Sequence, residues 1–549
     1  MAPPPSAISM EGLDDTTAAP FPNPLTLPLE VNDIFGRRNK ADKKQWGVAA
    51  PSVTSSFKIG SPRTDRPKAK RWDDHFTDET LLRKGSSLKQ AAKHLSKPGI
   101  ISLGGGLPSS EYFPFATLTS LVPTPPHFAE SDTTPSTGTE LRSGKHDLAT
   151  ERSIFDLSTA LNYGQGSGAA QLLRWIVEHT QLVHDPPYRD WACTMSIGST
   201  SALDMTLRMF TTKGEKILSE DYTFASAVQT AEPMGVGVVG VKMDAEGLLP
   251  GHMAEILGGW DAVKMGAPRP RVLYTVPTGQ NPTGATMGKQ RRQDVYAVAR
   301  QYDVIILEDE PYYFLQMQPY VAKTAGAESQ EPPPPRTHRE FLDALVPSFL
   351  SMDVDGRVIR MDSFSKVIAP GSRVGWITAS DQIVERYRKH ADVSTQGPSG
   401  FSQIILFKLL EEHWGHSGYL DWLLFIRMEY TSRREVILDA SEKFLPKEVV
   451  SWVAPSAGMF FWMKMDWRKH PQAGTQSLLE LEDEIYNTSI EEGSLVMKGS
   501  WFYADPSAKH DTLFFRATYA AAPSDKIQEA IRRFGVAVKK SFGLVANGV

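Results

Sequence analysis

Residues 272–284 read VLYTVPTGQNPTG, residues 304–312 read VIILEDEPY and residues 357–366 read RVIRMDSFSK. In each stretch a short, mainly apolar run passes into polar residues, Gly or Pro, which is typical of a buried strand that ends in a loop. A helical pattern at 202–210 follows a glycine turn at Gly198. Because strands and helices alternate from about residue 160 to 395, the sequence predicts an α/β domain with a mostly parallel sheet.

The rest of the chain is expected to form a smaller domain and several irregular segments. After about residue 396 the pattern is mainly helical, with short strands near 459–463 and 513–515, which indicates an α+β domain. Two stretches, about 123–151 and 322–338, are rich in turn residues and are predicted to be surface loops. Residues 37–71 are basic but broken by prolines, so we expect a solvated, flexible tail, with a nucleic-acid or anionic-surface contact as the alternative.

Composition excludes several classes of protein. The 549 residues are 41% hydrophobic and 22% charged, which allows a sizeable core, and the formal net charge of -5 does not favour nucleic acid as the main partner. No apolar run approaches the roughly 18 residues of a membrane span. A single cysteine, Cys193, leaves no intramolecular disulfide and no cysteine-based zinc cluster. We expect a reducing compartment, the cytoplasm, since the first thirty residues also lack the pattern of a presequence.

Polar residues at the ends of the predicted strands point to one site. In an open α/β sheet, ligands bind beyond the carboxyl ends of the strands. The residues that would meet there include Asn281, Asp309, Tyr312 and Lys366, with the start of a helix at Ser199. Taken singly, each has a simpler explanation, such as a surface acid, a solvated lysine, a turn or a helix cap. Their joint order and spacing favour a shared function.

Together these residue types suit pyridoxal phosphate chemistry. A lysine amine can bind the cofactor's aldehyde and move the proton on the substrate α-carbon. A carboxylate beside the pyridine nitrogen keeps that nitrogen protonated, so that the ring can accept carbanion electrons. Backbone N–H groups at a helix start, serine hydroxyls and an arginine suit the phosphate, and Asn and Tyr can donate to the ring oxygen. The sequence thus predicts a pyridoxal phosphate enzyme without a metal.

From about Arg71 to Ala537 the chain resembles the fold-type I pyridoxal-phosphate aminotransferases, in the branch of the fungal aromatic and mammalian aminoadipate/kynurenine aminotransferases. The stretch VPSFLSMDVDGRVIRMDSFSKVIAPGSR at 346–373 is particularly similar to the fungal aromatic subgroup. The resemblance implies a large domain on a mostly parallel, seven-stranded type of sheet and a smaller α+β domain. The expected parts are a flexible N-terminal extension (1–72), an N-terminal arm with part of the small domain and an insertion (73–160), a large cofactor-binding domain (161–395) and a C-terminal small domain (396–549).

The resemblance also implies a role for each matching residue. Lys366 matches the lysine that forms the Schiff base with the cofactor, and Asp309 matches the acid on the pyridine nitrogen. The other cofactor ligands would be Ser199, Thr200, Ser363, Ser365 and Arg373 on the phosphate, Tyr163 on the phosphate across a dimer interface, Tyr222 stacked on the ring, and Tyr312 and Asn281 on the ring oxygen. The substrate ligands would be Arg516, on the α-carboxylate, Asn281, and the covering loop with Gly106 and Leu107.

The implied activity is the transfer of the amino group of phenylalanine, tyrosine or tryptophan to 2-oxoglutarate, with 2-aminoadipate or kynurenine as further donors, by a homodimer with shared active sites. Candidate apolar walls of the substrate pocket are Tyr112, Phe113, Phe460 and Trp501, although core packing is the simpler role of each. One alternative is a β-lyase on the same scaffold. Another is an aminotransferase-like transcription regulator, but residues 37–71 lack the periodicity of a helix-turn-helix.

Overall fold

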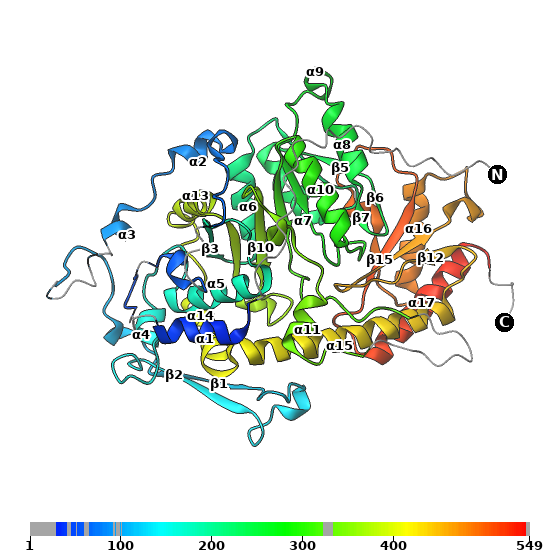
Figure 1. The fold of residues 1–549 in the computed structure, drawn as a ribbon. Coiled ribbons are helices and arrows are strands. Elements are labelled where there is room, and N and C mark those ends of the chain that lie inside the picture. Colours follow the sequence, from blue (N-terminus) through cyan, green and yellow to red (C-terminus); the bar gives the residue numbers. More distant parts are fainter. Residues whose placement is uncertain are drawn as a thin grey trace.

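The computed structural model describes residues 29–40, 46–50, 52–59, 65–91, 94, 99, 101–321 and 333–544. Its largest element is a seven-stranded sheet (Figure 1). The strand order is β3 (Trp191–Ser196), β11 (Gly375–Ser380), β10 (Val358–Ser363), β9 (Ile305–Asp309), β8 (Val272–Thr275), β4 (Lys216–Glu220) and β5 (Gly237–Val241). β11 is antiparallel to both of its neighbours, whereas the other neighbouring pairs are parallel. The predicted mostly parallel sheet is confirmed.

Alternating side chains on the strands build two cores, one on each face of this sheet. On β9, Ile305 and Leu307 pack into a core that also takes residues of α5 (Ala170–His184) and α6 (Ser199–Phe210). Ile306, between them, packs with residues of α8 (Pro250–Gly258), α10 (Lys289–Gln301) and α12 (Phe349–Met352). A strand buried on both faces is continuously apolar, which explains the run at 304–307. Further helices of this part of the chain are α7 (Ala225–Ala231), α9 (Ala262–Met265), α11 (His338–Asp343), α13 (Asp381–Ala391) and α14 (Gly400–Phe407).

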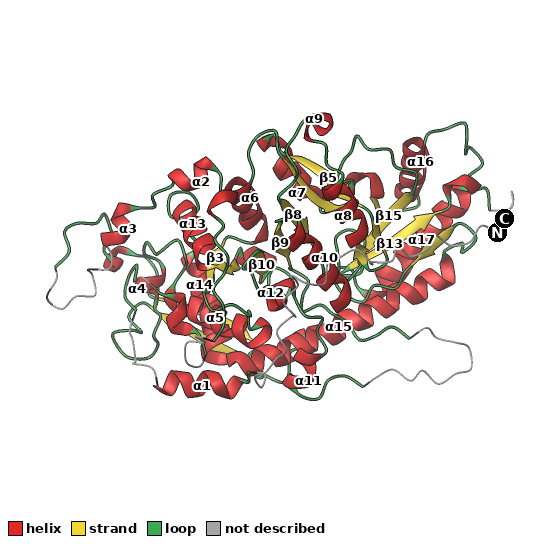
Figure 2. Cartoon of the chain, turned by 45° about the horizontal axis from the view of Figure 1, so that its top comes forward, coloured by secondary structure: helices red, strands yellow, loops and turns green. Residues whose placement is uncertain are grey.

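A second, antiparallel sheet lies at the other end of the molecule from α1 (Val31–Lys40) (Figure 2). Its strand order is β12 (Val450–Trp452), β13 (Phe460–Met465), β15 (Leu513–Thr518) and β14 (Met497–Lys498), which confirms the strands predicted near 459–463 and 513–515. The helices α16 (Leu478–Glu491) and α17 (Ser524–Ser541) pack on it.

Among the described residues, no helix combines the length and the apolar character needed to cross a membrane.

One long helix, α15 (Gly415–Phe444), joins the two cores (Figure 1, yellow). Leu420 and Leu423, near its start, pack into the core of the large sheet. Ile437 and Leu438, near its end, pack into the core of the small sheet. The predicted division at 395/396 therefore does not coincide with the division between the cores, because α14 and the first half of α15 pack with the large sheet.

The expectation that residues 123–151 form only loops is wrong. The segment is part of an antiparallel hairpin of β1 (Thr117–Val122) and β2 (Thr139–Gly144). Trp414 donates its indole N–H to the Pro123 carbonyl over 3.1 Å, and Phe128 is buried in the large core. The turn residues of the sequence thus occupy the connection of the hairpin, where they are favoured. Residues 322–332 of the other predicted loop lie outside the described residues.

The flexible N-terminal tail is also wrong for the described residues between 29 and 72. Ile34 of α1 is fully buried, and Phe57 and Trp72 belong to the large core. Arg37 and Arg38 of α1 form ion pairs with Glu178 of α5. Arg38 also pairs with Glu411, at 2.7 Å. The basic charges that suggested a solvated tail are therefore partly neutralised by acids of the folded body.

The remaining short elements lie elsewhere in the chain. They are the helices α2 (Asp78–Leu82), α3 (Ser87–Ala91) and α4 (Leu157–Ala160), and a small hairpin of β6 (Met243–Asp244) and β7 (Gly247–Leu248).

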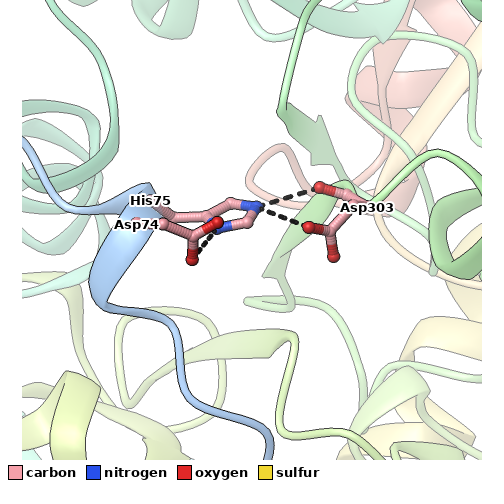
Figure 3. A group of neighbouring side chains, drawn as sticks. All are labelled: Asp74, His75 and Asp303. Atoms are coloured by element: carbon pink, nitrogen blue, oxygen red, sulfur yellow. Dashed lines mark hydrogen bonds and ion pairs between the residues drawn. The ribbon is translucent and has the colours of Figure 1, made fainter.

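His75 joins the segment before α2 to the residues that precede β9 (Figure 3). Its Nε2 lies 3.0 Å from the Asp303 carbonyl oxygen, and its Nδ1 lies 3.1 Å from Asp74 Oδ1. An imidazole and two carboxylates are a possible metal-ligand set. Each carboxylate already has a cation, however, since Lys70 pairs with Asp303 and Arg271 with Asp74. We therefore interpret the cluster as a link between segments.

Replacing Arg38 by alanine is expected to lower the free energy of unfolding by roughly 1.5–3 kcal/mol, because the fully buried Glu178 would lose charge-assisted hydrogen bonds while it keeps Arg37 as a cationic partner. The matched control is Arg71→Ala, since Arg71 pairs with Asp73 at the surface, where ion pairs contribute about 0–1 kcal/mol. Urea unfolding measures both variants. A flexible tail predicts the same midpoint for the two proteins, and that result would contradict the packed arrangement.

Candidate active site

Several loops meet at the carboxyl edge of the large sheet. Because β4, β8, β9 and β10 are parallel neighbours, their last residues lie at one edge, and α6 begins there after β3. In the register of β9 and β10, Asp309 lies beside Met361. The loop after β10 carries Lys366, and the loop after β8 carries Asn281. The predicted site residues of the large domain therefore come from neighbouring loops of one sheet edge.

Asp309 is a buried carboxylate with one unused oxygen. Tyr274 donates its hydroxyl to Asp309 Oδ2 over 2.9 Å. Oδ1 is buried and has no hydrogen-bond partner among the described residues. Burial raises the pKa of Asp309 to about 6, and the hydroxyl groups of Tyr274 and Ser199 partly oppose this rise. A buried acid with an unused oxygen suits a ring N–H donor such as a pyridinium nitrogen.

A group of hydrogen-bond donors lies at the start of α6 and in the loop after β10. Ser363 donates to Ser365 Oγ over 2.7 Å. Arg373 donates to Ser365 Oγ over 3.4 Å and to the Ile197 carbonyl over 3.1 Å. Ser199 Oγ, on the first residue of α6, is buried, has no close hydrogen bond within the described chain and lies near enough to Asp309 to lower the pKa of that carboxyl. Because the first N–H groups of a helix also lack intrahelical partners, this set suits an anion such as phosphate.

Gly198 allows Arg373 to approach the start of α6. Its φ is 93°, a conformation that residues with a side chain rarely adopt. A Cβ at this position would lie 2.1 Å from Arg373 Nη2. Any other residue here would therefore displace the guanidinium. Thr200, on the same first turn of the helix, is exposed.

Lys366 is partly buried, in the loop that carries Ser365. Burial lowers the pKa of its amine, and the positive charge of Arg373 lowers this pKa further. A lowered pKa increases the fraction of neutral amine, which can act as a nucleophile or accept a proton. The environment of Lys366 thus suits both of its predicted roles.

Arg516, on β15 of the small sheet, reaches the large sheet. Its Nη1 donates to Asn281 Oδ1 over 2.8 Å. The rings of Phe460 and Phe502 each lie 4.6 Å from the guanidinium carbon, and the ring of Tyr312 packs edge-on against Phe460 at 5.6 Å. Burial lowers the pKa of Arg516, an effect that Tyr312 opposes. Residues of both sheets are therefore brought together around one cation.

Two glycines allow the sheets to approach at this point. Gly279, in the loop after β8, and Gly458, just before β13, have φ values of 55° and 78°. A Cβ on Gly279 would lie 2.5 Å from the Cα of Gly458. The two backbones are in direct contact, so neither position has room for a side chain. The two glycines stand two residues before Asn281 and Phe460 in the chain, and both of those residues contact Arg516.

Tyr222 lies in an aromatic group that is shared by both sheets. Its hydroxyl forms a 2.7 Å hydrogen bond with Thr512 Oγ1, and its backbone carbonyl accepts one from Gln280 over 2.6 Å. The rings around it are Trp462, Tyr503, His510 and Phe514, with centroids 5.2–6.0 Å away. Burial raises the pKa of Tyr222, so its hydroxyl stays protonated. Its stacking on a cofactor ring stays a prediction.

Two of the predicted pocket walls face elsewhere. Tyr112 is 79% exposed. Trp501 is 46% exposed and packs against Tyr486 of α16. The neighbour of Trp501, Phe502, is the residue that turns inward. The sequence pattern gives no direct indication of Phe502 or Tyr274. A lone hydroxyl within the apolar run at 272–276 is the signal that could have indicated Tyr274.

The residues of the N-terminal arm are exposed within one chain. Gly106 and Leu107 lie in an exposed loop. The side chain of Asn162 donates a 3.1 Å hydrogen bond to the Pro108 carbonyl of this loop. Tyr163 is 59% exposed. Within the described chain, no contact joins Tyr163 to Asp309 or Arg373. Its contact with a phosphate across a dimer interface stays a prediction.

Comparisons with known proteins agree with this geometry. Residues 139–534 match the family model of the class I and II aminotransferases. The aromatic amino acid aminotransferase C56E4.03 of Schizosaccharomyces pombe is 45% identical, over 85% of this chain and 98% of that protein. The bovine mitochondrial kynurenine/alpha-aminoadipate aminotransferase is 30% identical, over 85% and 98% of the two chains. The crystal structure of aminotransferase Aro8 from Candida albicans superposes with a TM-score of 0.80 at 42% identity, over 87% of this chain and all of that one.

The cofactor of this family fits the residues that the chain supplies. The unused oxygen of Asp309 suits the pyridine nitrogen of pyridoxal phosphate, and the unpaired Ser199 hydroxyl, the start of α6 and Arg373 suit its phosphate. Lys366 is the amine of the same edge. On the family match, the similarity to the relatives and this fit, the chain belongs to the class I and II aminotransferases and is a pyridoxal-phosphate-dependent transaminase.

Proposed function

We propose that this enzyme transfers the amino group of phenylalanine, tyrosine or tryptophan to 2-oxoglutarate, giving aromatic 2-oxo acids and glutamate. The observation that carries the proposal is the aromatic surrounding of Arg516, where Phe460 and Phe502 contact the guanidinium. The names of the fungal relatives support aromatic donors. The bovine relative supports 2-aminoadipate and kynurenine as further donors.

Pyridoxal phosphate, when bound, supplies an aldehyde that binds amino groups and a ring that accepts electrons. Asp309 would hold a proton at the pyridine nitrogen through its unused Oδ1, because Tyr274 occupies Oδ2. The positive charge of that nitrogen favours the ionised carboxylate and so opposes the effect of burial on its pKa. Lys366 would move the proton at the substrate α-carbon, which its lowered pKa favours.

Arg516 would bind the α-carboxylate that all of the substrates share. Its Nη1 is oriented by Asn281, and the two aromatic rings limit the positions of the guanidinium plane. A fixed guanidinium fixes the orientation of the Cα–H bond relative to Lys366. Asn281 would thus serve both the cofactor ring oxygen and the substrate arginine.

The proposed active unit is a homodimer in the cytoplasm. The exposed ring of Tyr163 supports a contact with a second subunit, whose phosphate site it would complete. A single buried, free cysteine is compatible with reducing conditions.

A panel of amino donors tests the function directly. With 2-oxoglutarate, the purified yellow protein should form glutamate from phenylalanine, tyrosine and tryptophan, whereas Lys366→Ala should be inactive with each donor. Borohydride treatment of the wild type should fix the cofactor on the peptide that contains Lys366. Ammonia release in place of glutamate would favour the β-lyase alternative, and a cofactor fixed on another lysine would refute the assignment of Lys366.

Asp309→Asn is expected to keep the fold and most of the cofactor affinity but to lose several orders of magnitude in kcat. An amide cannot hold the pyridine nitrogen protonated, so the electron sink is lost. Single-turnover absorbance measurements with phenylalanine separate this loss from a loss of cofactor. A rate within about tenfold of wild type, which is roughly 1.4 kcal/mol in the barrier, would argue against the role.

Arg516→Lys is expected to lower kcat/KM for phenylalanine, tyrosine, glutamate and 2-oxoglutarate by similar factors. A lysine cannot reproduce the paired hydrogen bonds of a guanidinium, so the loss should be roughly 2–5 kcal/mol, or about 30-fold to several-thousand-fold. Phe460→Leu is the comparison, because a wall residue should change the ratio between aromatic and acidic substrates. A defect of Arg516→Lys confined to the dicarboxylic substrates would mean that Arg516 binds their side chains.

A further inference from the structure

A further pocket, lined by prolines and a few polar side chains, lies between α11, α15 and the segments 317–319 and 333–336. Its lining includes Gln318, Arg336, Glu340 and Arg427. None of these residues belongs to the candidate active site. Met317, which lines one wall of the pocket, donates its backbone N–H to the Ser456 carbonyl over 2.9 Å. This wall therefore contacts the segment that leads into the small sheet.

Arg427, on α15, is buried in this pocket without an acidic partner. It is 4% exposed, and its Nη2 donates to Gln318 Oε1 over 3.2 Å. Its Nε and Nη1 are buried and have no hydrogen-bond partner among the described residues, and the same holds for Gln318 Nε2. Burial lowers the pKa of Arg427. Buried guanidinium groups are normally paired, because an uncompensated buried charge is strongly unfavourable.

Arg434, two turns further along α15, shows the usual arrangement. It is also buried, but it donates to the Gln318 carbonyl over 2.8 Å and to Glu435 Oε1 over 2.6 Å. The same helix thus carries one buried arginine with an acidic partner and one whose partners are Gln318 and the ring of Phe341, 6.0 Å from the guanidinium carbon. The difference needs an explanation that is specific to the pocket of Arg427.

The charge of the pocket favours an anion. Arg336 lies exposed on its rim, and Glu340 is its one acidic residue among those described. Glu340 Oε2 already accepts a hydrogen bond from the Arg336 backbone N–H over 2.7 Å. Two guanidinium groups and an amide N–H group therefore face one carboxylate that is engaged in capping α11.

We propose that this pocket binds a small oxyanion, a phosphate or carboxylate group, through Gln318 Nε2 and one edge of the Arg427 guanidinium. Its oxygens would accept from Gln318 Nε2 and from one of the two unpaired guanidinium nitrogens, since the N–H bonds of Nε and Nη1 point to opposite edges of the group. Hydrogen bonds between a guanidinium and an anion are stronger than those between neutral groups. Because the pocket offers one such site, binding should be saturable. The site is separate from the phosphate and carboxylate sites of catalysis.

The test uses the holoenzyme with its cofactor fixed by borohydride, which keeps the catalytic phosphate site filled. Isothermal titration calorimetry at constant ionic strength measures the binding of inorganic phosphate in one arm and of acetate in the other. Wild type should bind one of the two probes saturably, with one site per chain, and Arg427→Met should bind it at least tenfold more weakly. Arg339→Gln is the matched control, because Arg339 lies on α11, pairs with Asp343 and does not line the pocket.

The arm that saturates identifies the ligand group as a phosphate or a carboxylate. Without anion, Arg427→Met should have a Tm no lower than that of wild type, because it removes an unpaired charge; with saturating anion, only wild type should gain Tm. If Arg427→Met does not fold, Gln318→Leu removes the other donor and should weaken binding as well. Absence of saturable binding in both arms, or binding that both variants retain, would overturn the proposal.

Discussion

The parallel register of β9 and β10 is the constraint on which the site depends. It sets Met361 beside Asp309, so the loop that carries Lys366 starts next to the acid at the end of β9. Because side chains alternate along a strand, a slip by one residue would turn Asp309 away from this edge. A buried ion pair fits this register: Arg360 of β10 lies opposite Glu308 of β9 and pairs with it at 3.2 Å.

The same network explains why three acids in a row follow the apolar run of β9. Glu308 and Glu310 are fully buried and face Arg360 and Arg292. Burial raises the pKa of Glu310 to about 7, which the two arginines oppose. Asp309, between them, points to the other side of the strand and keeps an oxygen unused. Alternation along the strand thus separates the structural acids from the acid that is available for chemistry.

The sequence predicts the parts of this enzyme that depend on local pattern. The strands at 272–276, 304–307 and 459–463, and the loops that follow them, are recognisable because apolar runs and turn residues mark them. Features that depend on distant partners are missed. The sequence predicts that Arg37 and Arg38 are solvated, whereas in the fold both pair with Glu178. Glu178 is distant in the chain, so no local pattern indicates this pairing. Phe502 and Tyr274 are missed for the same reason, since their partners Arg516 and Asp309 come from other elements.

The helix α15 has a consequence for the folding of the whole chain. Its 30 residues extend about 45 Å, and its two halves complete different hydrophobic cores. Neither core is closed until this helix is in place, so the two sheets cannot be separated into fragments that each retain a full apolar interior. A displacement of α15 would therefore disturb the packing of both cores, so the large and the small part of the enzyme are mechanically linked through one helix.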